Sequence, residues 1–320
     1  MKSISAALAI WVCATVPSFA QNPARMPVVG VMRVNTASNN EPFATLFREG
    51  LAARGYVEGG NLRLDYRFAD GDRRRFPEMA AALLKEKASV IVVFSDPAAR
   101  AAQRASDTIP IIAVVSDFVA AGLGASLAKP GGNVTGVSML EPELEGKRLE
   151  ILKEILPAAR RLALLNDSSA RQPLHAVEDA ARALGVSLQT VNVSSPAEFA
   201  AAFDALRAGG AEAVNIAGSS MLFNFRNEVG ALALARKLPA ICEWPEMAAA
   251  GCLASYGTSL RELYDTLAEL TEKILKGASP AELPARQPTK FELIFNLKVA
   301  REIGVEIPPP ILARADEVIE

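Results

Sequence analysis

Polar side chains follow the short apolar runs of this chain, at the points where predicted strands end. In the first part of the chain they form three pairs: Asn35 and Thr36, Ser95 and Asp96, and Ser116 and Asp117. In the second part they are Asn166 and Asp167, then Ser219 and Ser220, and then the segment 243–246, which ends with Glu246. The carboxyl ends of parallel strands meet at one edge of a sheet, where loops and helix N-termini can hold an anion such as a carboxylate. These positions therefore predict a site for a small polar molecule.

Each candidate also has a purely structural interpretation. The hydroxyl of Ser95 and the amides of the helix after Pro97 could hold a carboxylate, or Ser95 could simply cap that helix. Asp117 or Glu246 could pair with a ligand ammonium in a charge-assisted hydrogen bond, or could be a solvated loop acid. The ring of Tyr256 could line the site, or it could pack within the segment that crosses between the lobes. The sequence alone leaves these alternatives open.

The residues needed for catalysis are missing from the sequence. The single histidine, His175, falls in a predicted helix and has no Gly-x-Ser-x-Gly elbow to serve, so we expect it on the surface. The first strand is followed by the segment 35–40, which lacks the glycines of a nicotinamide-binding turn. One histidine and three cysteines are too few for a zinc or iron site. We therefore expect no enzymatic activity, no cofactor and no metal.

Short apolar runs alternate with longer segments of helical period. The runs fall in two series, at 28–32, 62–68, 90–94 and 111–115, and then at 162–165, 186–193 and 213–217. Runs such as 90–94 are apolar at consecutive positions, so both faces of the strand must be covered, as in a parallel sheet flanked by helices. The sequence thus predicts an α/β protein of two Rossmann-like lobes, each with a doubly wound parallel sheet.

Three crossings between the lobes are expected to form a hinge. The first follows the turn at 130–133, the second lies near 254–258, and the third lies in the segment with Pro280, Pro284 and Pro288, which precedes 291–295. We assign 26–138 and 257–288 to an N-terminal lobe, and 139–256 and 289–320 to a C-terminal lobe. A cleft between hinged lobes is a usual place for a small ligand.

The N-terminus has the pattern of an export signal. Lys2 precedes an uninterrupted apolar stretch at 6–16, and small residues end the segment at Ala20, where we expect cleavage. This stretch is shorter than the roughly 20 residues that span a bilayer, and charged residues interrupt every later apolar run. We therefore expect 1–20 to be a signal peptide and the mature protein to be periplasmic and not membrane-spanning.

The composition excludes some partners. The net charge is −2, and acidic and basic residues are mixed along the chain, so there is no basic stripe for a nucleic acid backbone. Cys242 and Cys252 remain after cleavage, and they could form a disulfide in an oxidising compartment. We favour the alternative that both pack as small buried apolar side chains.

Several motifs, in order over nearly the whole mature chain, resemble the ABC-transporter substrate-binding family that includes tryptophan- and tyrosine-binding receptors. They are Gly55-Tyr56-Val57-Glu58-Gly59, Ala128-Lys129-Pro130-Gly131-Gly132-Asn133, Glu145-Gly146-Lys147-Arg148-Leu149-Glu150, Ser255-Tyr256-Gly257, Gln287-Pro288-Thr289-Lys290-Phe291, and Leu312-Ala313-Arg314-Ala315-Asp316. The chain departs from the family at the expected pocket, with Ser95-Asp96-Pro97 where many members carry Gly-Thr-Pro.

The resemblance implies a type I periplasmic-binding-protein fold that closes on an amino acid or a similar small carboxylate. It also implies a membrane permease and an ATPase as partners, and we expect the protein itself to be a monomer. The alternative is an extracytoplasmic sensor subunit, which would bind the same kind of ligand and report to a membrane receptor.

Overall fold

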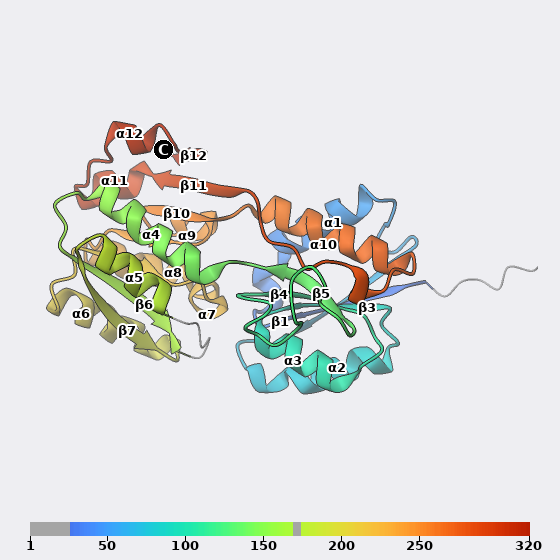
Figure 1. Ribbon diagram of the computed structural model, residues 1–320. Helices are drawn as coiled ribbons and strands as arrows, with labels where there is room; N and C mark the ends of the chain where they lie inside the picture. Colours follow the sequence, from blue (N-terminus) through green and yellow to red (C-terminus); the bar gives the residue numbers. More distant parts are fainter. Residues whose placement is uncertain (1–25, 169–173) are drawn as a thin grey trace, which may run out of the picture.

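Two lobes, each a sheet between layers of helices, lie side by side in the protein (Figure 1). The computed structural model describes residues 26–168 and 174–320, so the signal peptide expected at 1–20 lies outside the described residues. Within the described ranges, no helix is long and apolar enough to cross a membrane.

The sheet of the first lobe is entirely parallel and has the strand order β2-β1-β3-β4-β5. Its strands are β1 (Val28–Arg33), β2 (Arg63–Phe68), β3 (Val90–Phe94), β4 (Ile111–Val115) and β5 (Val134–Ser138). One face is covered by α2 (Phe76–Lys85) and α3 (Asp96–Ala105), and the other by α1 (Glu41–Ala52) and α10 (Leu260–Leu275). Both faces of β3 are buried, which explains why its sequence is apolar at consecutive positions.

The sheet of the second lobe repeats this topology and then extends it. Its order is β12-β11-β10-β9-β8-β6-β7, in which β7-β6-β8-β9-β10 corresponds to β2-β1-β3-β4-β5. The strands are β6 (Arg161–Asp167), β7 (Ser187–Val193), β8 (Ala213–Ile216), β9 (Ala240–Cys242), β10 (Ala254–Thr258), β11 (Phe291–Asn296) and β12 (Glu317–Ile319). The expectation of a parallel sheet holds except that β11 runs antiparallel to β10. The chain leaves the lobe along β10 and returns along β11, so these neighbours must run in opposite directions.

Helices cover both faces of the second sheet as well. One face carries α4 (Glu141–Ile155), α5 (His175–Ala183), α11 (Leu297–Ile303) and α12 (Pro309–Leu312). The other carries α6 (Phe199–Ala208), α7 (Ser220–Asn224), α8 (Arg226–Ala235) and α9 (Pro245–Ala249). His175, the first residue of α5, is exposed, and Cys242 and Cys252 are free and buried, so the packing interpretation of the cysteines fits the structure.

The chain passes between the lobes in three places. The first crossing lies between β5 and α4, the second between β10 and α10, and the third leads from η5 (Pro280–Glu282) into β11. The Ser259 amide donates to the Lys290 carbonyl at 3.0 Å, and Ser138 donates to Arg286 at 2.8 Å, so the third crossing pairs with both others. β10 continues in the second sheet to Thr258, which is two residues past the expected lobe bound at 256.

Candidate ligand-binding site

A cavity of about 150 Å³ lies between the two lobes, close to the volume of a core cavity that holds benzene. Its wall on the first lobe contains residues at the ends of β1, β3 and β4, at 33–35, 94–97 and 114–116. Its wall on the second lobe contains residues that follow β8 and β9, between 218 and 224 and at 244. Both sets surround the point where the strand order reverses, which is the usual ligand position in open α/β sheets.

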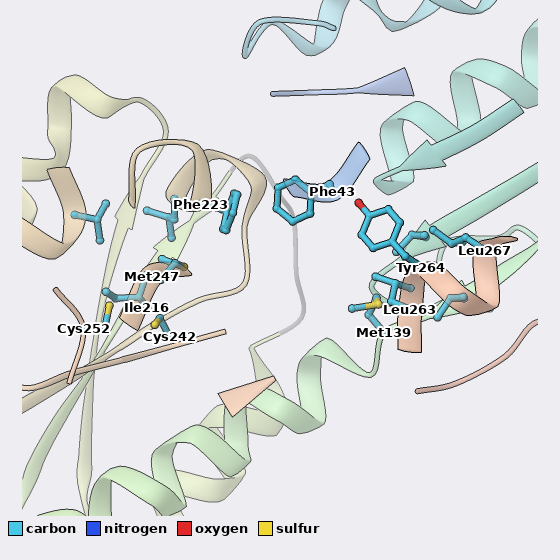
Figure 2. Close-up of a cluster of buried hydrophobic side chains, with 14 of the residues drawn as sticks. Phe43, Met139, Ile216, Phe223, Cys242, Met247, Cys252, Leu263, Tyr264 and Leu267 are labelled. Atoms are coloured by element: carbon cyan, nitrogen blue, oxygen red, sulfur yellow. The ribbon is translucent and has the colours of Figure 1, made fainter. Parts of the chain in front are cut away.

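Aromatic rings form much of the wall. Phe43, Phe94 and Tyr264 come from the first lobe, and Phe223 and Trp244 come from the second. The rings of Phe43 and Phe223 meet across the cleft edge-on, with centroids 5.3 Å apart, and Figure 2 shows them next to each other. Phe223 also packs edge-on against Trp244 at 5.0 Å. Because rings from both lobes touch, the structure is a closed form.

Arg33, the last residue of β1, brings a positive charge into this aromatic wall. Its guanidinium carbon lies 4.2 Å from the centroid of Phe94 and 4.7 Å from that of Phe43, within cation–π range. Nη1 donates to the Tyr264 hydroxyl at 2.6 Å, and Nε donates to Asn35 Oδ1 at 3.3 Å. Arg33 forms no ion pair with any of the described residues. Burial raises the pKa of the Tyr264 hydroxyl, so this group stays protonated beside the arginine.

Three polar atoms near the cavity have no hydrogen-bond partner within the described part of the chain. They are Asn35 Nδ2, Trp244 Nε1 and Asn224 Oδ1. All three residues line the cavity, and Asn35 is only 4% exposed. A buried donor or acceptor that stays unsatisfied costs about 1–3 kcal/mol, so these atoms are suited to a guest that completes their bonds.

Ser95 occupies a strained position at the cavity edge. Its backbone has φ 134° and ψ 154°, a region that essentially only glycine adopts. Its hydroxyl accepts from the Ala98 amide at 3.4 Å and thus caps α3. This strain falls where the sequence departs from the glycine of many family members.

Asp96 supplies a carboxylate to the same wall. Burial raises the pKa of this carboxyl, while a backbone hydrogen bond from Ser116 and the charge of Arg100 on the same helix lower it by smaller amounts. Burial thus opposes the ionised form, and a cationic group of a ligand would favour that form.

An ion pair joins the two lobes at the cavity. Arg73, in the 3₁₀ turn η2 (Arg73–Arg75) of the first lobe, places Nη2 3.3 Å from Asp167 Oδ2 at the end of β6. The Asp167 side chain is 0% exposed and also accepts from the Ser219 hydroxyl at 2.6 Å. Ser219 in turn accepts from the amides of Met221 and Leu222 and caps α7.

A second buried ion pair supports the loop that carries Ser219. Arg148, fully buried in α4, lies 2.7 Å from Glu145 Oε1 and donates to the Tyr256 carbonyl at 2.9 Å. Glu145 also accepts from the Gly218 amide at 2.8 Å and from Asn215 Nδ2 at 2.6 Å. The network thereby fixes Gly218, which is part of the cavity wall.

The structure brings together six of the residues that the sequence proposed as ligand contacts. Those that line the cavity are Asn35, Ser95, Asp96, Ser116, Ser219 and Ser220. Those that lie outside its wall are Thr36, Asp117, Asn166, Glu246 and Tyr256. The ligand contacts themselves stay a prediction.

Two of the residues outside the wall have a structural role that the sequence left open. Asp117 is exposed and accepts from the amides of Val119 and Ala120, both at 2.9 Å. The Tyr256 ring stacks on Phe291 with centroids 6.0 Å apart, so it packs within the crossing strands.

Of the other three residues, two form hydrogen bonds with local partners. Asn166 donates to Asn192 Oδ1 at 2.8 Å, and the Thr36 hydroxyl bonds with that of Ser38. Glu246, in α9, is half-buried, and burial raises the pKa of its carboxyl.

Sequence reasoning missed Arg33, Phe43, Arg73 and Tyr264 as cavity residues, whereas Trp244 lies within the segment 243–246 that it proposed. Arg33 gives one signal, because it is a charged residue directly before the end of an otherwise apolar run. Phe43 and Tyr264 lie on helices and read as ordinary core positions, which they also are. No spacing pattern marks the few core residues that meet a second lobe.

The paired lobes, the three crossings and the cavity between them define a two-lobed binding protein of the type I periplasmic-binding-protein fold. A family model described as ABC transporter substrate binding protein matches residues 41–319. The chain therefore belongs to this family of solute-binding proteins, which are not enzymes, and the resemblance seen in the sequence is confirmed.

Individual relatives support the same conclusion. The chain is 28% identical to a tyrosine-binding protein of Clostridioides difficile over 264 residues, which is 81% of this chain and 76% of that protein. A solved domain from Streptococcus pneumoniae in complex with L-Trp is 25% identical, with a TM-score of 0.84 over 92% of this chain and 99% of that one. A ligand-free, open substrate-binding protein from Clostridium difficile, with the same identity and coverage, has a TM-score of 0.68. The closed geometry thus lies nearer to the liganded relative.

Proposed function

We propose that this chain is the extracytoplasmic receptor of an ABC importer, that it captures an aromatic amino acid by closing its two lobes, and that it delivers this ligand to a membrane permease. The observation that carries the proposal is the interlobe cavity with aromatic walls from both lobes. An aromatic ligand side chain would pack against rings of this wall, such as Phe223 and Trp244, with about 0.5–1.5 kcal/mol per aromatic pair beyond area burial. The relatives named for tyrosine and L-Trp support the same ligand class.

We infer closure of the two lobes because the residues of the cavity wall are divided between them. Neither lobe alone surrounds a ligand, since each contributes only some of the rings and polar groups. A ligand that contacts both lobes binds the closed form better than the open form and shifts the population toward it. A permease can then distinguish the loaded receptor from the empty one by the relative position of the lobes.

Binding can be followed through the protein's own fluorescence. The chain contains two tryptophans, of which Trp11 lies in the expected signal peptide and Trp244 lines the cavity. Titration of the mature protein with L-phenylalanine, which adds no indole signal, should change the emission of Trp244, and L-tyrosine and L-tryptophan should raise the melting temperature. No thermal shift with any of the three amino acids would overturn the proposed ligand class.

Closure has its own test in the Arg73–Asp167 pair, which forms only when the lobes meet. Arg73→Gln should weaken amino acid binding about tenfold, because a hydrogen bond to a charged group contributes about 1.5–3 kcal/mol and 1.4 kcal/mol is tenfold in affinity. Arg74→Gln is the matched control, since the neighbouring Arg74 is 91% exposed and pairs with Asp72 in its own turn. X-ray scattering should show ligand-dependent compaction in the wild type, and identical profiles at saturation would contradict closure.

The importer role is tested in cells. Deletion of the gene should abolish high-affinity uptake of the labelled amino acid. Intact uptake with a lost transcriptional or motile response to that amino acid would instead identify a sensor subunit.

A further inference from the structure

The guanidinium of Arg33 is held in place by the protein but is not neutralised by it. Two aromatic rings, the Tyr264 hydroxyl and Asn35 Oδ1 contact it, and none of these groups carries a negative charge. A buried or half-buried charge without a counter-ion is costly, so proteins pair such charges or leave them for a ligand. The described bonds use Nε and Nη1, which leaves the Nη2 end of the fork for a guest.

Asn35 adds a second, independent observation at the same place. Its Oδ1 accepts from Arg33, and its Nδ2 is buried without a partner, in a side chain that is 4% exposed and lines the cavity. An amide donor without an acceptor, beside a guanidinium whose Nη2 end is left by the described bonds, forms a subsite for an anion.

The other charged groups of the wall are already engaged or have the opposite sign. Arg73 forms its ion pair with Asp167, and Asp96 is an acid. The second lobe contributes neutral groups, such as Ser219, Asn224 and Trp244. One positive charge without a counter-ion among the described residues matches an anionic group of the ligand, and the planar fork of arginine fits a carboxylate.

We propose that Arg33 and Asn35 bind the carboxylate of the ligand, and that Phe43, Phe94 and Tyr264 act as positioning residues for the guanidinium. This assignment rests on the proposed function and refines it, since it fixes which end of the amino acid the first lobe holds. The aromatic side chain of the ligand is then directed toward the rings of the second lobe.

The experiment compares two ligands with four variants by calorimetry. L-tryptophan carries the carboxylate, and L-tryptophanamide replaces it with a neutral amide while it keeps the ammonium and the indole. The wild type should bind the amide about 100-fold more weakly, and Arg33→Gln should bind L-tryptophan about 100-fold more weakly while its affinity for the amide stays within about twofold. Arg33→Lys should recover part of the loss, because lysine keeps the charge but not the fork.

Two further variants separate recognition from packing. Asn35→Asp places an acid beside Arg33 with almost no change in volume, and it should abolish the preference for the carboxylate. Arg226→Gln is the matched control, because Arg226 also stacks on a cavity aromatic, 4.8 Å from the Phe223 centroid, but lies outside the wall. It should bind L-tryptophan as the wild type does.

The outcomes distinguish this assignment from the proposed function. Equal losses for acid and amide in Arg33→Gln, or equal affinities of both in the wild type, would overturn the Arg33 assignment and leave the aromatic amino acid in place. Binding of indole-3-acetate but not of L-tryptophan would overturn the amino acid and support the carboxylate subsite. Binding of neither carboxylate would overturn both.

Discussion

The two lobes differ in how their polar side chains at the cleft are satisfied. On the second lobe, Arg148 is fully buried yet lies 2.7 Å from the Glu145 carboxylate, and Ser219 caps its helix from an ordinary extended backbone with φ −154°. On the first lobe, Arg33 has no ion pair within residues 26–168 and 174–320, and Ser95 caps its helix from a strained backbone. The buried arginine of the second lobe thus has an acid of its own lobe beside it, whereas Arg33 of the first lobe has neutral neighbours.

The largest expected effect is a difference in unfolding free energy between variants of Arg148 and variants of Arg33. Arg148→Met leaves the buried Glu145 carboxylate without its counter-ion, so it should lower the free energy of unfolding by about 3–5 kcal/mol. Arg33→Met leaves no buried charge without a counter-ion and removes only contacts with aromatic rings and neutral polar groups, so without ligand it should cost less, about 1–3 kcal/mol. Urea unfolding of the ligand-free protein measures both values.

The control for this pair is Lys147→Met, next to Arg148 on the same helix. Lys147 is 39% exposed and pairs with Glu150 on the surface, so its loss should change stability by less than about 0.5 kcal/mol. A cost for Arg33→Met as large as that for Arg148→Met would contradict the contrast between the lobes.

The fold was largely readable from the sequence because it depends on local patterns. The consecutive apolar residues of β3 require a strand covered on both faces, and the polar residues that follow strands, such as Ser95 and Ser219, do reach the cavity. The cavity was less readable, because helix residues such as Phe43 and Tyr264 follow the same periodicity as any core residue. Their role depends on a contact with the other lobe, as between Phe43 and Phe223, and no local pattern encodes that contact.

A smaller effect on stability is expected when either of the two helix-capping serines, Ser95 or Ser219, is replaced by glycine. Ser95→Gly removes the strain of a backbone conformation that costs about 1–3 kcal/mol in other residues, and glycine at a helix N-cap loses only a few tenths. The variant should therefore be about 1 kcal/mol more stable than the wild type in thermal or urea unfolding.

Ser219→Gly is the corresponding variant on the second lobe. There the backbone is unstrained, and the substitution removes bonds to the Met221 and Leu222 amides and to Asp167, so it should be about 1 kcal/mol less stable. If both glycine variants changed stability in the same direction, the strained backbone at Ser95 would not lower the stability of the wild type measurably.

The smallest expected effect is the contribution of Asp96, an acid of the first lobe, to the pH dependence of stability. Burial raises the folded-state pKa of Asp96 above the ordinary value of 3.8. A raised folded pKa means that the carboxyl's contribution to stability is fully present below the unfolded pKa and is lost as the pH rises through the folded pKa. Asp96→Asn has no charge to bury, so it should be more stable than the wild type at neutral pH, and the difference should disappear below about pH 3.8.

A bound amino acid should remove that advantage, because its ammonium beside the Asp96 carboxylate would stabilise the ionised form. The measurement is the melting temperature of both proteins between pH 3 and 8, with and without saturating L-tryptophan. The expected result is a crossing, in which Asp96→Asn is the more stable protein when empty and the less stable one when loaded. If the difference in melting temperature between the two proteins did not change with pH or with ligand, Asp96 would be a solvated helix residue. The first lobe would then have no carboxylate that pairs with the ligand ammonium.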